Sequence, residues 1–186
     1  MKASTLITLC IPTRDGLFTA SYSATGLAAL GFPSDRKPSA IKNVPAQVRC
    51  WHRDTTDALK AALSGRSPKA LPPLDQSAGT EFQQRVWNAM RRIACGETQS
   101  YGDLARAIGK PGAARAVGGA CGANPIPVLV PCHRVLAAHR KLGGFSSGLH
   151  WKRTLLRREG SLVNAPTQPC AAGRRKMKAQ TGRKRR

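Results

Sequence analysis

The sequence is poor in acidic and aromatic residues. Only nine of its 186 residues are Asp or Glu, against 31 Lys and Arg, and only nine are Phe, Trp or Tyr. No apolar run approaches the roughly 18 residues that a membrane-spanning helix requires, so an integral membrane protein is not expected. The apolar stretch Leu6–Ile11 is short and interrupted by Thr8. This pattern favours a strand over a secretory signal peptide, and we expect a cytoplasmic protein.

The sequence also lacks the cysteine pairs that metal sites need. Its six cysteines stand at positions 10, 50, 95, 121, 132 and 170, with no CxxC spacing and no Cys-Cys-His-His cluster. A structural metal is therefore not expected. In a reducing compartment most of these residues should be free thiols.

The net charge of +22 indicates a polyanionic partner. Solubility alone requires only about 2 to 8 charges in a small domain. Eight basic residues and no acidic ones follow Gly160, but residues 1–159 still hold 23 basic against nine acidic side chains. The folded part is thus basic in its own right, and nucleic acid is the leading candidate for its partner.

Periodicity and turn signals divide the chain into two domains and a tail. Residues 1–78 fit a small α/β domain, with short strands up to residue 32, a helix over about 50–63 and a linker rich in Pro, Ser and Gly. Residues 79–160 fit a second domain that is mainly helical. The tail, 161–186, has few large apolar groups and many charges, so we expect it to be disordered.

The second domain contains a pattern that resembles a helix-turn-helix. Thr80-Glu81-Phe82-Gln83 fits a capping box that begins one helix. Two shorter helices are expected over 101–108 and 113–121, on either side of Gly109-Lys110-Pro111-Gly112. The later one consists of small residues, with Arg115 as its only long side chain. Close approach to a nucleic-acid backbone and tight packing between helices would explain these small residues equally well.

The segment Val130–Val135, with sequence VPCHRV, carries the clearest chemical signal. It follows an apolar, extended stretch and places Cys132 directly before His133 and Arg134. His133 can accept the thiol proton and Arg134 adds positive potential, and both favour the nucleophilic thiolate. The remaining cysteines are interpreted as small apolar residues.

A group that could orient the histidine lies on the last predicted helix, residues 150–159. Trp151, Leu155 and Glu159 stand at i, i+4 and i+8, which puts Glu159 on the apolar face, where a carboxylate needs a partner. Glu159 is also the only acidic residue after Asp103. A Cys-His-Glu set and a surface ion pair with a neighbouring basic residue are both open at this point.

These motifs resemble the O6-alkylguanine-DNA alkyltransferases, the methylated-DNA–protein-cysteine methyltransferases. The resemblance covers residues 79–160 and runs through GTEFQQRVW, SYGDLA, ARAVG, CGANP, VPCHRV, GGF and the closing EG. The first half matches only in general plan. The resemblance implies an α/β N-terminal domain, with a small antiparallel sheet plus helix of the ribonuclease H-like type. A mainly α, winged helix-turn-helix-like domain would follow.

The resemblance also implies a reaction. The alkyl group of O6-alkylguanine in duplex DNA would pass irreversibly to the protein's own cysteine, after the damaged base has rotated out of the helix. No cofactor would be needed, and a nucleoid-associated monomer would act once. Activity on O4-alkylthymine and cooperative binding along DNA stay open. The alternatives are an alkyltransferase-like lesion-binding protein and a regulator. The presence of Cys132 disfavours the first, and the lack of a metal-binding cysteine cluster disfavours the second.

Roles for individual residues follow from the same resemblance. Catalysis would use Cys132 as alkyl acceptor, His133 and Glu159 as an activating relay through water, and Tyr101 as proton donor to guanine. DNA binding would use Arg115, which fills the gap left by the flipped base, with Tyr101, Ala114, Gly118 and Arg134. The guanine pocket would comprise Asn124, Val135, Phe145, Ser146 and Cys121. Many relatives have Tyr in place of Phe145, so this pocket would lack one donor. The basic tail is an addition to the family pattern, and we expect it to tether the protein to DNA nonspecifically.

Overall fold

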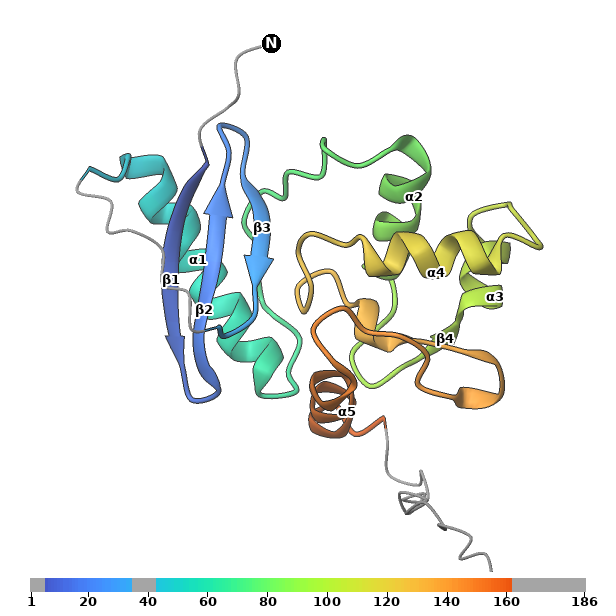
Figure 1. The fold of residues 1–186 in the computed structure, drawn as a ribbon. Coiled ribbons are helices and arrows are strands. Elements are labelled where there is room, and N and C mark those ends of the chain that lie inside the picture. Colours follow the sequence, from blue (N-terminus) through green and yellow to red (C-terminus); the bar gives the residue numbers. More distant parts are fainter. Residues whose placement is uncertain (1–5, 35–42, 162–186) are drawn as a thin grey trace, which may run out of the picture.

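The computed structural model describes residues 6–34 and 43–161 (Figure 1). The tail expected to be disordered therefore lies outside the described residues, apart from Ser161. Three strands, β1 (Ile7–Thr13), β2 (Gly16–Tyr22) and β3 (Leu27–Gly31), form an antiparallel sheet in the order β1-β2-β3. Helix α1 (Ala46–Leu63) packs against this sheet. The expected small antiparallel sheet plus helix is confirmed.

The strands form where the sequence alternates between apolar and polar residues. Phe18, Ala20 and Tyr22 of β2 are buried at every second position, as one face of a half-buried strand requires. Gly16 has φ of 118° at the turn between β1 and β2, a conformation that favours glycine. Helix α1 begins four residues earlier than the sequence suggested, directly after Pro45, because proline is compatible with a helix start.

The second half of the chain is mainly helical. Its elements, in chain order, are α2 (Glu81–Met90), β4 (Gln99–Ser100), α3 (Tyr101–Ala107), α4 (Ala114–Gly122), the 3₁₀ turn η1 (Cys132–Arg134), β5 (Val135–Leu136), the 3₁₀ turn η2 (Ala138–Arg140) and α5 (Leu149–Arg158). The predicted capping box is confirmed, with reciprocal hydrogen bonds between Thr80 and Gln83. A second one joins Ser100 and Asp103 at the start of α3.

The segment before Cys132 differs from the expectation of an extended strand. Its ends, Pro127 and Val130, form only an isolated bridge, and Val128 between them adopts φ of 74°. The side chain of Asn124 holds this buried turn: it donates to the carbonyl of Val130 at 2.8 Å and accepts from the N–H of Ile126 at 3.0 Å. Because an amide side chain replaces the hydrogen bonds of a neighbouring strand, the apolar run does not need a sheet partner.

The two halves share one hydrophobic core. Trp151 of α5 lies 4.8 Å from Phe32 and 5.7 Å from Phe18, measured between ring centroids. Next to this cluster the guanidinium of Arg158 donates to both carboxylate oxygens of Asp15, at 2.7 and 2.8 Å. The domain boundary at residue 78 stays a prediction, since the buried core is continuous across it. In the described part of the chain, no helix is long and apolar enough to cross a membrane.

Candidate active site

Cys132 is the first residue of η1 and is only 5% exposed. Its backbone N–H donates to the carbonyl of Val130 at 2.8 Å, so the turn held by Asn124 continues directly into the cysteine. Helix α5 and helix α2 both pack against η1. Cys132 therefore has a fixed backbone and a mostly desolvated side chain.

Behind Cys132, one carboxylate binds two basic side chains. Glu159 Oε1 lies 2.9 Å from His133 Nε2, and the guanidinium of Arg134 donates to both carboxylate oxygens, at 2.9 and 3.0 Å. Burial raises the pKa of Glu159, but the hydrogen bonds from His133 and Arg134 outweigh it and lower the pKa to about 2. The carboxylate is thus ionised at neutral pH. The structure brings Glu159 together with both His133 and the neighbouring basic residue Arg134, and these contacts lie inside the protein rather than at its surface.

His133 is in a state in which it can accept a proton. Its side chain is 1% exposed, and burial lowers its pKa despite the hydrogen bond to Glu159, so the imidazole is neutral. The ionised carboxylate of Glu159 can only accept a hydrogen bond. The histidine nitrogen that faces it, Nε2, therefore carries the proton of the neutral ring. Nδ1 is then an acceptor, and it is buried without a hydrogen-bond partner among the described residues. One basic nitrogen of the residue that follows Cys132 is thus free to accept a proton.

The thiol itself is not activated in the way we expected. Burial raises the pKa of Cys132, and hydrogen bonding from Asn124 and the charge of Lys152 oppose this rise only in part. Arg134 does not supply the expected potential, because its guanidinium is bound to Glu159 and donates to the carbonyl of Ile93 at 2.6 Å. Cys132 therefore rests as a thiol and needs a base to become a nucleophile.

Lys152 is a site residue that the sequence analysis missed. It is fully buried, and its ammonium group donates to the carbonyls of Val135 at 2.6 Å and Gly144 at 3.3 Å. Burial lowers its pKa to about 8, although the nearby thiols of Cys132 and Cys121 favour the charged form. Lys152 lies seven residues before Glu159, on the same helix face. That spacing is the available signal, but lysine is so often exposed that the spacing alone does not identify a buried residue.

Tyr101, Cys121 and Cys132 lie close enough to affect one another electrostatically. Burial raises the pKa of Tyr101, both thiols add to the rise, and the backbone N–H of Gly144 opposes it. Burial likewise raises the pKa of Cys121 to about 12. Gly143 lies against the tyrosine ring so closely that an added Cβ would be 2.9 Å from its hydroxyl oxygen. The loop that contains Gly143 and Gly144 thus packs against Tyr101.

The residues expected to bind DNA lie on α4, apart from Tyr101 and Arg134. Arg115 is exposed in the first turn of α4 and Ala114 is half-buried. Gly118 lies one turn further, and a Cβ added there would meet only the ring of Tyr101, at 3.9 Å. In contrast, Arg134 is 8% exposed with its guanidinium bound inside the protein, which does not support direct contact with DNA. The other roles stay predictions.

The residues expected to form the guanine pocket differ in their exposure to solvent. Val135 is buried and its carbonyl accepts from Lys152, whereas Ser146 is exposed. Phe145 is half-buried and packs edge-on against Phe32 of the first domain, with 5.9 Å between ring centroids. Phe145 therefore also joins the aromatic contact between the two halves, a role that the sequence analysis did not assign.

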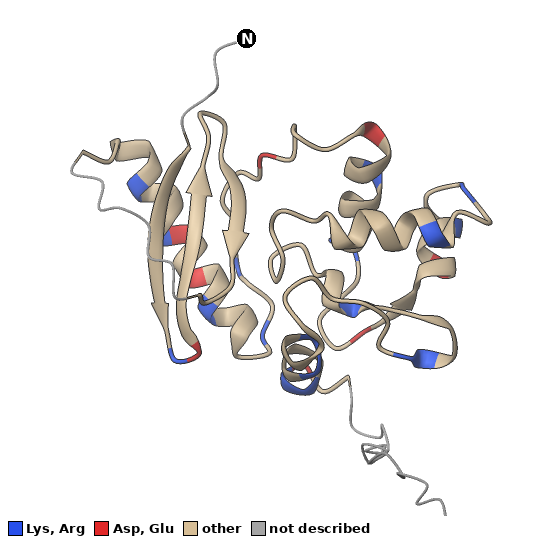
Figure 2. Cartoon of the chain, in the orientation of Figure 1, with Lys and Arg blue, Asp and Glu red and all other residues tan. Residues whose placement is uncertain are grey.

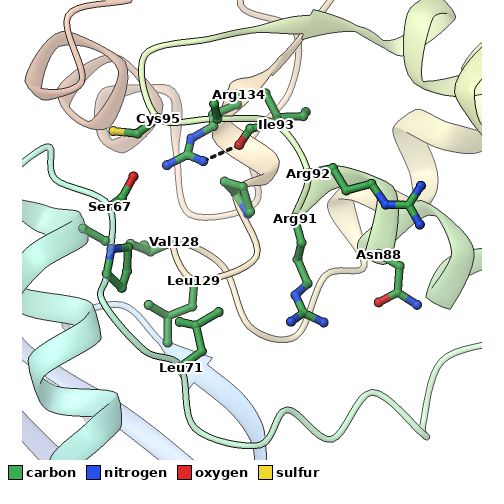
Figure 3. A pocket seen from close by; sticks show the side chains of 14 residues that line it. Ser67, Leu71, Asn88, Arg91, Arg92, Ile93, Cys95, Val128, Leu129 and Arg134 are labelled. Atoms are coloured by element: carbon green, nitrogen blue, oxygen red, sulfur yellow. Dashed lines mark hydrogen bonds between the residues drawn. The ribbon is translucent and has the colours of Figure 1, made fainter.

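A cavity of about 570 Å³ lies behind the segment 128–131, and Cys132 does not line it. Figure 3 shows Arg134 reaching the carbonyl of Ile93 at its wall, with Arg91 and Leu129 nearby. This cavity is separate from the thiol. No group of three or more potential metal ligands occurs in residues 6–34 and 43–161.

Known proteins resemble this chain over much of its length. Residues 81–161 match the DNA binding domain of 6-O-methylguanine DNA methyltransferase. The chain is 41% identical over 136 residues to a methylated-DNA–protein-cysteine methyltransferase of Methanosarcina acetivorans, covering 73% of this chain and 86% of that protein. It is 52% identical over 109 residues to the Mycobacterium tuberculosis enzyme of that name, covering 59% of this chain and 66% of that protein.

The solved structures give the same result over most of the chain. A crystal structure of Mycobacterium tuberculosis OGT in complex with DNA superposes with a TM-score of 0.69 at 39% identity, covering 83% of this chain and 92% of that one. The Methanosarcina relative is matched over most of its length at an identity that shows common descent. The chain belongs to the methylated-DNA–protein-cysteine methyltransferase family.

Proposed function

We propose that this protein repairs DNA by moving the alkyl group from O6 of guanine in duplex DNA to Sγ of Cys132. One observation carries the proposal: His133, which follows Cys132 in the chain, is buried and neutral, is held by the ionised Glu159, and keeps its Nδ1 without a hydrogen-bond partner among the described residues. Membership of the methyltransferase family supports the choice of substrate. The reaction is a methylated-DNA–protein-cysteine S-methyltransferase reaction with a single turnover.

The first step is removal of the thiol proton. His133 Nδ1 takes the proton of Cys132, directly or through a water molecule, and becomes an imidazolium. The carboxylate of Glu159, at 2.9 Å from Nε2, stabilises that charge and fixes the ring. A thiol with a raised pKa loses its proton only while this base is neutral. The low pKa of His133 therefore belongs to the mechanism.

The second step is an in-line displacement at the alkyl carbon. The sulfur of Cys132 forms the new S–C bond, the C–O6 bond breaks, and its electron pair stays on the purine. The phenol of Tyr101, whose raised pKa keeps it protonated, donates a proton to that purine and restores guanine. A thioether has no easy leaving group, so the protein is consumed by one repair.

Duplex DNA reaches the site through the segment α3–turn–α4, which we assign as a winged helix-turn-helix-like unit. The small residues of α4 allow close approach to the nucleic-acid backbone, and the exposed Arg115 fills the stack when the damaged nucleotide is flipped out. Asn124 and Val135 shape the guanine pocket, with Ser146 at its rim. We further assign residues 1–78 to a ribonuclease H-like domain and residues 79–160 to the catalytic domain.

Mass spectrometry of the peptide that contains Cys132 tests the acceptor. After incubation with duplex DNA that carries O6-methylguanine, this peptide should gain one methyl group. Cys132→Ser should abolish the gain, while the exposed Cys50 offers a matched control in Cys50→Ser, which should not. Methyl on another cysteine, or more than one guanine repaired per protein molecule, would rule out the mechanism.

Arg115→Ala separates base flipping from chemistry. The variant should lose far more activity on duplex DNA than on free O6-benzylguanine, because only the duplex requires a side chain to fill the stack. Equal losses on both substrates would remove the flipping role and leave the transfer reaction in place. Exposed Arg91 provides a control in Arg91→Ala, which should retain the wild-type ratio.

A further inference from the structure

Two consecutive residues with positive φ form the tip of a hairpin next to the proposed active site. His139 has φ of 57° and ψ of 34°, and Arg140 has φ of 56°. The N–H of Lys141 donates to the carbonyl of Ala138 at 3.3 Å, and the N–H of Ala137 donates to the carbonyl of Lys141 at 2.8 Å. These features define a two-residue turn of type I′, which needs positive φ at both central positions.

The residues at this tip are unfavourable for the turn they form. Type I′ turns prefer Asn-Gly, Asp-Gly or Gly-Gly, because a Cβ is strained in the left-handed region. Here the central pair is His139-Arg140, followed by Lys141. A chain selected for the turn alone would not place three basic or ionisable side chains there. The strain points to a role for the side chains themselves.

The three side chains are exposed and available. His139, Arg140 and Lys141 are all exposed, and none of the ion pairs between described residues involves them. The turn therefore presents positive charge to solvent without an internal partner. Phosphate groups of nucleic acid are the anions that such a cluster complements.

The base of the hairpin is held against the reacting centre. Strand β5 leads from η1 to the tip and pairs with β4 immediately before Tyr101. On the return arm, Gly143 lies against the Tyr101 ring and the carbonyl of Gly144 accepts from Lys152. The tip is therefore positioned by the contacts that the residues on either side of it make with β4, Tyr101 and Lys152.

The hairpin and the expected DNA-binding helix lie on one edge of the molecule. Figure 2 shows Lys and Arg positions along this edge, in the turn before α4, on α4 itself and at η2. The exposed basic residues of these elements are Lys110, Arg115, Arg140 and Lys141. A duplex bound at α4 would thus pass the hairpin tip.

We propose that residues 138–141 form an arm that contacts backbone phosphates of the duplex, beside the stretch of DNA that α4 binds. This inference rests on the proposed function, since it takes duplex DNA as the partner. Arg140 and Lys141 each neutralise one phosphate, and the rigid type I′ turn fixes their spacing. The arm adds affinity that is independent of base sequence and lengthens the contacted stretch of DNA.

Arg140→Gly tests the arm, because it removes the charge and relieves the left-handed strain together. Binding to an undamaged duplex is measured by fluorescence anisotropy at several salt concentrations. The slope of log affinity against log salt should become shallower by about 0.9 in Arg140→Gly, and by about 1.8 in Arg140→Gly with Lys141→Ser. The melting temperature of Arg140→Gly should rise by about 1 to 4 °C, so weaker binding cannot come from unfolding.

Two control variants make the test specific. Arg140→Lys keeps the charge and the strain and should keep the wild-type slope. Lys60→Gln removes an exposed charge on α1, away from the edge in question, and should also keep it. An unchanged slope in Arg140→Gly overturns the proposal, as does an equal loss in Lys60→Gln. Methyl transfer by the wild-type chain is assayed in parallel, and its absence would reject the proposed function rather than the arm.

Discussion

Replacing Glu159 by Gln should weaken the fold as well as the chemistry. The carboxylate is 2% exposed and accepts hydrogen bonds from His133 and from two nitrogens of Arg134. Glutamine keeps the size of the side chain but removes its charge. Arg134 would then remain buried without a counter-ion, and a neutral amide cannot accept from all three donors.

Two arguments give the same magnitude for this loss. A pKa lowered from 4.5 to about 2 corresponds to about 3 kcal/mol of added stability for the ionised carboxylate. Independently, breaking a buried ion pair by removing one partner costs about 3 to 5 kcal/mol. We therefore expect Glu159→Gln to lower the free energy of unfolding at pH 7 by about 3 kcal/mol, which lowers the melting temperature by about 6 to 12 °C.

The pH dependence provides the sharper assay. The folded pKa of Glu159 lies below its unfolded value, so its contribution is complete above pH 4.5 and is lost as the pH falls towards 2. In urea titrations, the gap between wild type and Glu159→Gln should be constant from pH 8 to pH 5 and shrink below that. Glu97→Gln, at an exposed carboxylate, is the matched control. A gap below about 0.5 kcal/mol at pH 7, or one that persists at pH 2.5, would refute this reasoning.

Three further substitutions test separate contacts. Lys152→Met should slow transfer from duplex and from free O6-benzylguanine alike in rapid-quench assays, because the carbonyls of Val135 and Gly144 lose their donor; a loss confined to duplex would contradict this. Gly143→Ala should destabilise more than Gly109→Ala in thermal melts, since both glycines have positive φ but only the first is crowded; equal effects would exclude the clash. Arg158→Ala should cost about 1 to 3 kcal/mol in urea titrations through its lost pair with Asp15; a loss below about 0.5 kcal/mol would show that this pair contributes little.

Local signals in the sequence predicted several helix starts and turns. They also predicted the part of the candidate site formed by His133 and Glu159. The capping box at Thr80 and the turn at Asp15-Gly16 involve residues close in sequence, so short motifs specify them. The pairing of His133 with Glu159 could also be expected, because a lone acid on an apolar helix face needs a partner. The VPCHRV motif supplied one such partner, His133.

The remainder depends on contacts between distant segments, which no local pattern encodes. Asn124 turns an apolar run that resembles a strand into a buried loop. Arg134 was assigned to the thiolate because it is adjacent in sequence, but its side chain points to Ile93 and Glu159. Lys152 satisfies carbonyls from two other segments. In each case the deciding partner is a backbone carbonyl or a side chain that periodicity does not identify.

Adjacent residues at the end of α5 connect the first domain to the proposed relay. Arg158 binds Asp15 at the β1–β2 turn and donates to the carbonyl of Leu63 at the end of α1, whereas Glu159 faces His133. Gly65 closes the contact, since an added Cβ would lie 1.9 Å from the carbonyl oxygen of Arg158. The backbone that carries Glu159 is thus fixed from the sheet side. Because a base acts only at a defined distance from its thiol, we expect the first domain to support the proposed reaction by holding this helix end.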